Sequence, residues 1–198
     1  MGPFTVQETE IKLRIDDPRA ARDRLDRLGF EAVTPRLFER NLVYDTPSES
    51  LRNSGQVLRL RSKGDRWWLT HKTRPEAGAR HKVRQELEIE TRQGPELGDI
   101  LERLGFRPSF EYQKYRTEYR RPGDPGEVVL DETPIGNFLE LEGAPDWIDV
   151  TAADLGYRPP DYILESYGAL YLAWCSERGV APSHMVFPEK KGLLPFNP

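Results

Sequence analysis

Charged and apolar residues alternate along nearly every extended segment of this chain. In the first of them, VQETEIKLRI, Glu8, Glu10 and Lys12 share one parity, while Ile11 and Leu13 share the other. A period of two is typical of a β-strand, whose successive side chains point to opposite faces. Two neighbouring carboxylates can hold a divalent cation, and the ammonium beyond them suits a phosphate. The segment therefore predicts a strand with chemistry on its charged face.

The same sorting recurs on six further segments. Taken alone, each could be a solvated ladder of salt bridges on an open sheet. Taken together, their apolar faces support helices and outer packing, which gathers the charged faces inside. The residues on these faces are Arg59 and Arg61; Thr70 and Lys72; Lys82, Arg84, Glu86, Glu88 and Glu90; Lys114 and Arg116; Asp131; and Glu140 and Glu142.

An internal repeat indicates how the strands are organised. The segments DRLDRLGF and DILERLGF end amphipathic helices at Gly29 and Gly105, which lie 76 positions apart. Glycine readily takes the left-handed conformation that stops a helix. An alternating strand precedes each helix, at 5–15 and 81–91, and three strands follow it, the last two as a hairpin that turns at 63–65 or 134–136. We interpret the chain as a duplication of a strand, helix, strand, strand, strand unit.

Two such units predict an α+β fold: an eight-stranded antiparallel β-barrel with helices packed outside. Closing the sheet removes its exposed edges and leaves a narrow interior. We expect one domain over 1–178, with halves at about 5–75 and 80–143, two C-terminal helices within 146–177, and a tail at 179–198. The second helix, over 161–177, places Ile163, Tyr167 and Tyr171 on one face, which we expect to pack against the barrel. The tail is expected to be mostly loosely held, with a docking patch at 185–187.

Composition narrows the class of protein. Charged residues make up 31% of the chain but the net charge is only −4, so the arrangement of charges matters more than their sum. A single cysteine, Cys175, excludes an internal disulfide and suits a reducing compartment. No apolar run has membrane-spanning length and no signal-peptide core is present. We therefore expect a cytoplasmic protein that does not associate with membranes. Cys175, His71 and His81 are expected to be structural residues.

The two hairpins differ in the sign of their charge. The first carries Arg59, Arg61 and Lys72, whereas the second carries Asp131, Glu140 and Glu142. A barrel lined by a cationic and an anionic wall is costly to bury unless ions or a charged ligand fill it. A linear triphosphate with Mg²⁺ or Mn²⁺ satisfies both walls. Nucleic acid is disfavoured, because the basic residues alternate into a narrow interior and form no outward stripe.

The sequence motifs that contain these residues resemble those of the CYTH proteins, also called triphosphate tunnel metalloenzymes. The family includes class IV adenylyl cyclases, thiamine triphosphatases and inorganic tripolyphosphatases, and its fold is an eight-stranded antiparallel tunnel. The family signature ExExK resembles residues 8–12. The further similar motifs, from about residue 6 to 174, are YDT at 44–46, LRLR at 58–61, LTHK at 69–72, KVRQELE at 82–88, KYR at 114–116, LDE at 130–132, ELEG at 140–143 and SYGAL at 166–170.

The resemblance implies roles for individual residues. The basic residues would bind the triphosphate: Lys12, Arg59, Arg61, Lys72, Lys82, Arg84, Lys114 and Arg116. Carboxylates would hold Mg²⁺ or Mn²⁺: Glu8, Glu10, Glu140 and Glu142, with Asp131 assisting. Three residues are candidates for the catalytic step: Glu88, which would orient a water, Arg61 and Lys72.

Three functions stay open at this point. The first is metal-dependent hydrolysis of a triphosphate, either inorganic tripolyphosphate, thiamine triphosphate or a nucleoside triphosphate. The second is cyclisation of ATP to cyclic AMP and pyrophosphate, which would use the same ions. The third is non-catalytic binding of polyphosphate or nucleotides. The sequence shows no separate adenine-reading motif, and a homodimer is compatible with it although nothing argues for one.

Overall fold

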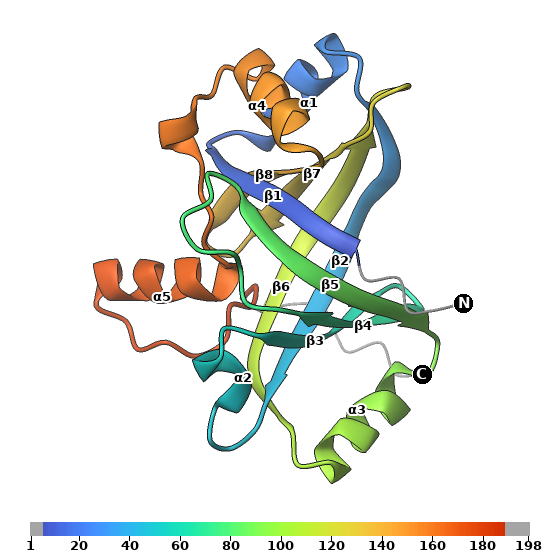
Figure 1. Ribbon diagram of the computed structural model, residues 1–198, viewed down its shortest axis with the longest axis vertical. Helices are drawn as coiled ribbons and strands as arrows, with labels where there is room; N and C mark the ends of the chain where they lie inside the picture. The colour runs from blue at the N-terminus through green and yellow to red at the C-terminus, as the bar shows by residue number, and fades with distance from the viewer. Residues whose placement is uncertain (1–5, 189–198) are drawn as a thin grey trace.

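The computed structural model describes residues 6–188, and the chain folds into two similar halves (Figure 1). The first half contains β1 (Val6–Ile15), α1 (Pro18–Arg27), β2 (Glu31–Asp45), α2 (Ser50–Asn53), β3 (Val57–Lys63) and β4 (Arg66–Lys72). The second contains β5 (Lys82–Thr91), α3 (Gly94–Arg103), β6 (Arg107–Arg120), β7 (Glu127–Thr133) and β8 (Gly136–Glu142). The first strand, helix and second strand of each half begin 76 positions apart, as the predicted duplication requires.

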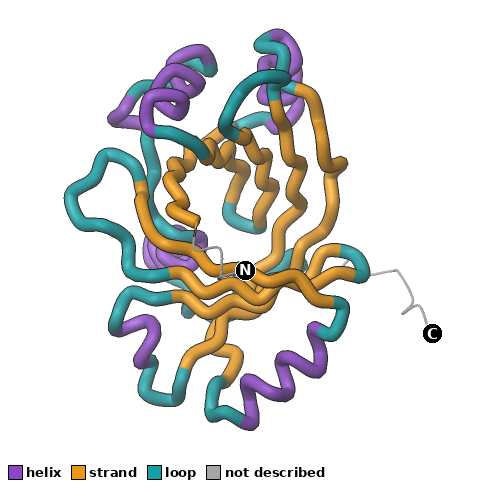
Figure 2. The backbone as a smooth tube through the Cα atoms, turned by 45° about the vertical axis from the view of Figure 1, so that its right-hand side comes forward, coloured by secondary structure: helices purple, strands orange, loops and turns teal. Residues whose placement is uncertain are grey.

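The eight strands form a closed antiparallel barrel, which confirms the predicted fold (Figure 2). Their order around the barrel is β1-β5-β4-β3-β2-β6-β7-β8, and β1 closes the ring by pairing with both β5 and β8. The β3–β4 hairpin lies four places from the β7–β8 hairpin in this order. The basic and the acidic hairpin of the sequence therefore occupy opposite sides of the barrel.

The apolar faces of the strands point outward, beneath the helices. Leu13 and Leu139 are fully buried with Leu25 of α1 and Ile148 of α4 (Pro145–Asp154) in the largest core cluster. A separate cluster under α3 contains Tyr44, Leu60 and Leu101. Burying each large apolar side chain contributes about 1.5–3 kcal/mol. The helices thus stabilise the barrel from outside and leave its inner face to polar groups.

Helices α1 and α3 begin and end where the sequence indicates. Asp17 caps α1 by accepting a hydrogen bond from the backbone nitrogen of Arg19 at 2.8 Å, and Pro18 is its first residue. After these two helices, Gly29 and Gly105 have φ angles of 81° and 93°. Those angles lie in the left-handed region, which glycine adopts without the steric cost of a β-carbon.

The C-terminal helix is shorter than predicted. A 3₁₀ turn, η1, spans Pro159–Asp161, and α5 runs only over Tyr167–Arg178. Ser166 caps α5, its hydroxyl accepting from the backbone nitrogen of Ala169 at 3.2 Å. The prediction that Ile163 lies on this helix is wrong, because its backbone pairs with Lys12 of β1 through two hydrogen bonds of 2.9 Å. The apolar spacing of the helix extends to the residues before its N-cap, Ser166. The backbone at Ile163 is nevertheless extended, because it bonds to Lys12 on a part of β1 that β5 does not pair with.

The tail docks on β6 at the patch predicted from the sequence. Met185 is buried and forms a parallel bridge with Tyr112 of β6, with backbone hydrogen bonds to Glu111 and Gln113. The nitrogen of Phe187 also donates to the side chain of Gln113 at 3.2 Å. The predicted docking patch thus exists as an added stretch of backbone pairing. Positions 189–198 of the predicted tail lie outside the described residues.

The cysteine and the two histidines that were expected to be structural lie away from the barrel interior. Cys175 is buried in α5. His71 contacts Gln56, and His81 contacts Asp149 of α4 at 2.8 Å. Among residues 6–188, no helix combines the length and apolar character needed to cross a membrane.

Candidate active site

The inner faces of the strands enclose a cavity of about 1140 Å³. Predicted site residues reach it from six of the eight strands. Thirteen of them line the cavity: Glu8, Glu10, Lys12, Arg59, Arg61, Lys72, Lys82, Arg84, Glu88, Lys114, Arg116, Glu140 and Glu142. The fourteenth, Asp131, is fully buried beneath Lys114 and Arg116.

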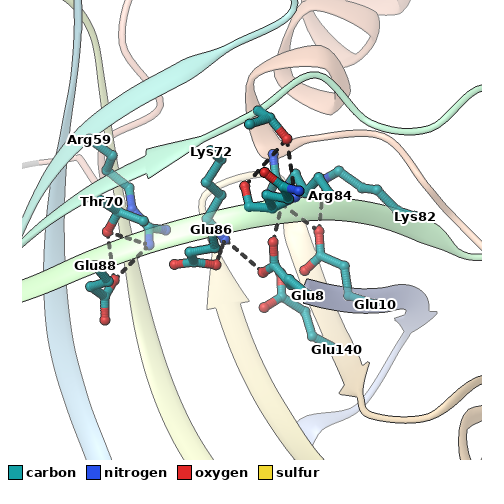
Figure 3. A network of polar contacts seen from close by, with 12 residues as sticks. Glu8, Glu10, Arg59, Thr70, Lys72, Lys82, Arg84, Glu86, Glu88 and Glu140 are labelled. Atoms are coloured by element: carbon teal, nitrogen blue, oxygen red, sulfur yellow. Dashed lines mark hydrogen bonds and ion pairs between the residues drawn. The ribbon is translucent and has the colours of Figure 1, made fainter. Parts of the chain in front are cut away.

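The two glutamates of β1 are each held by cations, which come mainly from β4 and β5 (Figure 3). Glu8 accepts hydrogen bonds from Lys72 Nζ at 2.6 Å and Arg84 Nε at 2.9 Å. Glu10 accepts from Lys82 Nζ at 2.7 Å and, more weakly, from Lys12 Nζ at 3.3 Å. Strand β1 lies beside β5, so the alternation of both strands brings these opposite charges face to face.

A second group of charges lies on the acidic hairpin. Asp131 accepts from Lys114 at 2.9 Å and from Arg116 Nε at 2.7 Å. Arg116 also contacts Glu140, whose other oxygen lies 3.3 Å from Lys12 Nζ. Lys12 thus stands between Glu10 and Glu140 and links the two groups.

The basic hairpin forms a third group around Glu88. Thr70 donates to Glu88 at 2.5 Å, and Arg61 donates to the same carboxylate at 3.2 Å. Arg59 donates to the hydroxyl groups of Thr70 and Tyr112, both at 3.2 Å. Glu88 is therefore oriented by two hydrogen-bond donors while remaining in the cavity wall.

The cations control how the carboxyl groups ionise. Burial alone would raise the pKa of Glu10, but the charges of Lys12 and Lys82 hold it well below its usual range. Burial, together with the charge of Lys12, lowers the pKa of Lys82 to about 8 despite its contact with Glu10. A ligand that brings negative charge beside Lys82 would reinforce its protonated form.

Glu142 behaves differently from the other carboxylates. Its side chain is exposed at the end of β8, where it lines the cavity, and no ion pair or hydrogen bond joins it to another described residue. Desolvation and the negative charges of Glu8 and Glu10 raise the pKa of Glu142 to about 8. A cation beside Glu142 would relieve this repulsion.

Sequence reasoning missed several residues of the interior. Glu39 and Asn41 of β2 are fully buried, and neither side chain finds a hydrogen-bond partner among the described residues. Glu86 forms an ion pair with Lys72 at 2.7 Å; the sequence pattern places it on the charged face of its strand but predicts no role for it. Tyr167 of α5 was expected only to pack, but its hydroxyl donates to Asp131 at 2.7 Å. The shared parity of Glu39 and Asn41 in FERNLVYD was the available signal for the first pair.

Comparison with known protein families decides the classification. The family model described as the CYTH domain matches residues 6–149, which include all eight strands. The chain belongs to the CYTH family. The residues that suggested this resemblance are those that now line one cavity.

One relative in sequence and two solved structures are similar to this chain. A protein of Methanocaldococcus jannaschii named "Putative adenylate cyclase" is 28% identical over 135 residues, covering 68% of this chain and 75% of that protein. The solved structure of a putative adenylate cyclase from Vibrio parahaemolyticus superposes with a TM-score of 0.72 at 19% identity, covering 82% of this chain and 96% of the other. A protein from Hippeastrum, described as a putative adenylyl cyclase with a dominant triphosphatase activity, gives 0.62 at 22% identity, with coverage of 88% and 97%. At these identities, the two structures show the shared fold.

The donor chemistry of the cavity fits a divalent metal. Glu8, Glu10, Glu140 and Glu142 supply the hard oxygen ligands that Mg²⁺ and Mn²⁺ prefer. Within 6–188, however, no three acidic, histidine or cysteine side chains are already grouped as a metal site. Lysine and arginine side chains instead form ion pairs with the carboxylate oxygens of Glu8, Glu10 and Glu140. If phosphate oxygens drew these cations away, the carboxylates would become free for metal.

Proposed function

We propose that this CYTH protein hydrolyses a triphosphate with the help of a divalent cation. The observation that carries the proposal is the barrel cavity, whose wall is lined by eight basic and five acidic predicted site residues. A charged interior of this kind is costly without a ligand that matches both signs. A triphosphate chain with bound Mg²⁺ or Mn²⁺ does so, because its oxygens suit arginine and lysine and its metal suits carboxylates.

Binding would exchange one set of partners for another. Lys72 and Arg84 now bind Glu8, and Lys82 binds Glu10. These cations would turn to phosphate oxygens when the triphosphate enters, and the glutamates would turn to metal. The exchange keeps each buried charge paired, so ligand and metal are expected to bind cooperatively.

The catalytic step would depend on charge neutralisation and on an oriented water. The metal, when bound, supplies a Lewis acid that polarises the phosphoryl oxygens. Arg61 and Lys72 would stabilise the charge that develops on the transferred phosphoryl group. Glu88 is the candidate for orienting the attacking water, since Thr70 and Arg61 fix its carboxylate in the cavity wall.

The name of the archaeal relative supplies a second candidate, adenylate cyclisation. In that reaction the ribose 3′-hydroxyl attacks the α-phosphate and pyrophosphate leaves. The same cations and carboxylates would act, and only the position of the nucleotide along the tunnel would differ. Non-catalytic binding is the third possibility, and it would show metal-dependent affinity without product.

One assay separates these functions. The purified chain is incubated with tripolyphosphate, thiamine triphosphate and ATP, each with Mg²⁺ or Mn²⁺ and each with a chelator as control. Release of orthophosphate supports hydrolysis, whereas cyclic AMP with pyrophosphate supports cyclisation. Tight binding of any of the three without product would overturn both enzymatic proposals.

A further inference from the structure

Strand β1 changes its pairing partner at one point along its edge. Its pairing with β5 ends where Glu10 lies opposite Lys82, which is the first residue of β5. Two residues further along β1, the backbone of Lys12 exchanges two hydrogen bonds of 2.9 Å with Ile163. The segment that joins α4 to α5, drawn in orange near the start of β5 in Figure 1, therefore takes the place of β5 at this point.

Asp149 of α4 connects the two segments that meet there. Its Oδ1 accepts hydrogen bonds from Nε2 of His81 at 2.8 Å and from the hydroxyl of Tyr162 at 3.0 Å. We call Asp149, His81 and Tyr162 the junction cluster. His81 directly precedes Lys82, and Tyr162 directly precedes Ile163. One carboxylate thus ties the start of β5 to the segment that replaces it beside β1.

The junction cluster is well placed to keep its geometry. His81 is buried, and its ring centroid lies 6.0 Å from that of Tyr162. Burial raises the pKa of Asp149, but the hydrogen bonds from His81 and Tyr162 outweigh it and hold that pKa below its ordinary value. The carboxylate is therefore ionised at neutral pH and can only accept, so both neighbours donate to it. Arg80 also donates to Asp149 at 3.0 Å, but its side chain is mostly exposed and contributes less.

The junction cluster lies behind two cations of the candidate site. Alternation along the chain turns His81 outward to Asp149 and Lys82 inward, where its Nζ binds Oε1 of Glu10 at 2.7 Å (Figure 3). Lys12 Nζ lies 3.3 Å from the same oxygen. The backbone of Lys12 is held by the Tyr162 segment, and that of Lys82 by the His81 side of the junction cluster. Separation of the two segments would therefore move the two ammonium groups apart.

We infer that Asp149 is a positioning residue for the triphosphate: by tying the start of β5 to the segment fixed on Lys12, it keeps Lys82 and Lys12 together where they meet phosphate oxygens. This inference rests on the proposed function. Asp149 belongs to α4, outside the barrel, and it does not line the cavity, so it acts through the lysines and touches no substrate. Tyr162 lies beyond residue 149, where the match to the family model ends, so the matched domain does not contain the whole junction cluster.

Asp149→Ala tests this role with tripolyphosphate and Mg²⁺. We expect KM to rise about tenfold and kcat to stay within about twofold of the wild type, because the two lysines would hold the phosphate chain equally in the substrate and in the transition state. A purely structural role would instead reduce the active fraction, which lowers kcat and leaves KM unchanged. A KM within about twofold of the wild type in folded Asp149→Ala would overturn the inference.

Asp124→Ala is the matched control. Asp124 also anchors α4, since it accepts from Nε1 of Trp147 at 2.8 Å and from Arg121 at 2.9 Å, but these bonds reach neither segment of the junction. Its KM should equal that of the wild type. His81→Phe keeps a ring beside Tyr162 and removes the donor to Asp149, so it should reproduce the rise in KM, and it provides the test if circular dichroism shows that Asp149→Ala is unfolded. If neither variant folds, the junction cluster serves the fold alone and the inference fails.

A double-mutant cycle tests whether Asp149 acts through Lys82. Lys82→Ala should raise KM by itself, and adding Asp149→Ala should then change KM by less than about twofold, because the side chain to be positioned is gone. A further tenfold rise would overturn the inference, since Asp149 would then act by another route.

The failure of this inference can be distinguished from the failure of the proposed function. If the wild-type chain hydrolyses no triphosphate, the proposed hydrolysis fails, and calorimetric dissociation constants for tripolyphosphate in Mg²⁺ replace KM in every comparison. If it hydrolyses tripolyphosphate and Asp149→Ala keeps the wild-type KM, the hydrolysis stands and the positioning role fails. A wild-type chain that neither hydrolyses nor binds tripolyphosphate would overturn both.

Discussion

Tyr167 donates a hydrogen bond from its hydroxyl to Oδ2 of Asp131 at 2.7 Å, and this contact ties α5 to the inside of the barrel. Asp131 is fully buried and is also held by Lys114 and Arg116. Burial and the negative charge of Asp131 raise the pKa of Tyr167 well above its ordinary value, so its hydroxyl stays protonated and remains a donor. The C-terminal helix thus supports the charged interior as well as packing on it.

Tyr167→Phe should lower the free energy of unfolding by about 2 kcal/mol, because a hydrogen bond to a buried carboxylate is lost. Urea denaturation at neutral pH measures the change. Tyr44→Phe is the control, since no hydrogen bond joins the Tyr44 hydroxyl to another described residue and its loss should change stability little. Equal stability of Tyr167→Phe and the wild type would show that Asp131 is satisfied by its cations alone.

Glu10→Gln should abolish turnover of the proposed substrate, with at least a hundredfold loss of kcat/KM, while the chain stays folded. The amide cannot replace the charge that pairs with Lys82 and that would hold the metal. Steady-state assays with Mg²⁺ measure the effect. Glu90→Gln is the matched control, because Glu90 pairs with Arg66 outside the cavity. Full activity of Glu10→Gln would contradict the proposed site.

Arg61→Ala should also reduce kcat/KM at least a hundredfold in the same assay, because it removes a cation from the cavity wall and releases Glu88. Arg66→Ala changes the same residue type on the adjoining strand, where the side chain is mostly exposed, and should have little effect. If both variants kept the activity of the wild type, Arg61 would have no part in turnover.

Glu39→Gln tests the buried carboxylate of β2. Lys114 and Arg61 lie 3.7 and 3.9 Å from its oxygens, and these charges outweigh burial and lower the pKa of Glu39 to about 2. We expect a loss of about 3 kcal/mol at pH 7, because the variant leaves buried cations less compensated. The pKa of Glu39 is lower in the folded state than its usual value of 4.5. Its ionised carboxylate therefore stabilises the protein fully above pH 4.5, and this stabilisation is lost as the pH falls towards 2.

The stability difference between Glu39→Gln and the wild type should therefore shrink between pH 4.5 and 2. Guanidinium denaturation at a series of pH values measures it. Glu96→Gln, at an exposed position in the first turn of α3, should change stability by less than about 1 kcal/mol at any pH. A pH-independent difference for Glu39→Gln would point to packing and not to charge.

Glu142→Gln should act in the opposite sense. The folded-state pKa of Glu142 is raised to about 8, so ionisation opposes folding as the pH rises from 4.5 through 8. The variant should be more stable than the wild type at pH 9 and equal to it at pH 4, as measured by metal-free thermal unfolding. Added Mg²⁺ should reduce the advantage at pH 9. A variant less stable than the wild type at pH 9 would contradict this assignment.

Much of the barrel could be predicted because its strands obey simple alternation. On β3, β5 and β8 the charged residues at alternate positions line the cavity from Arg59 to Arg61, from Lys82 to Glu88 and from Glu140 to Glu142, whereas Glu90, further along the same face of β5, lies outside it. Alternation gives less information on β2, where the pairing with β6 shifts register at three places between Ala32 and Tyr44. Such irregularities change which residues face inward. The register is regular from Leu37 to Val43, however, so the shared parity of Glu39 and Asn41 could have predicted that both lie inside.

The C-terminal features depended on contacts that periodicity does not encode. A helical pattern shows which side of α5 meets the barrel, but it does not show that the hydroxyl of Tyr167 reaches Asp131. Backbone pairing of Ile163 with Lys12, and of Met185 with β6, leaves no repeating pattern in the sequence. Tertiary structure decided these positions.

The closure of the barrel by β1 has a consequence for how the protein folds. Lys82 and Glu142, the register partners of Glu10, lie 72 and 132 positions further along the chain. During synthesis the first strand emerges long before either neighbour, and pairings of such sequence separation form slowly. The charged face of β1 can meet its partners on β4 and β5 once residue 84 has been made, whereas Glu140, the partner of Lys12, arrives only with the last strand. Closure of the barrel therefore waits for β8, and a chain that ends before this strand would lack both the closed barrel and the β8 side of the site.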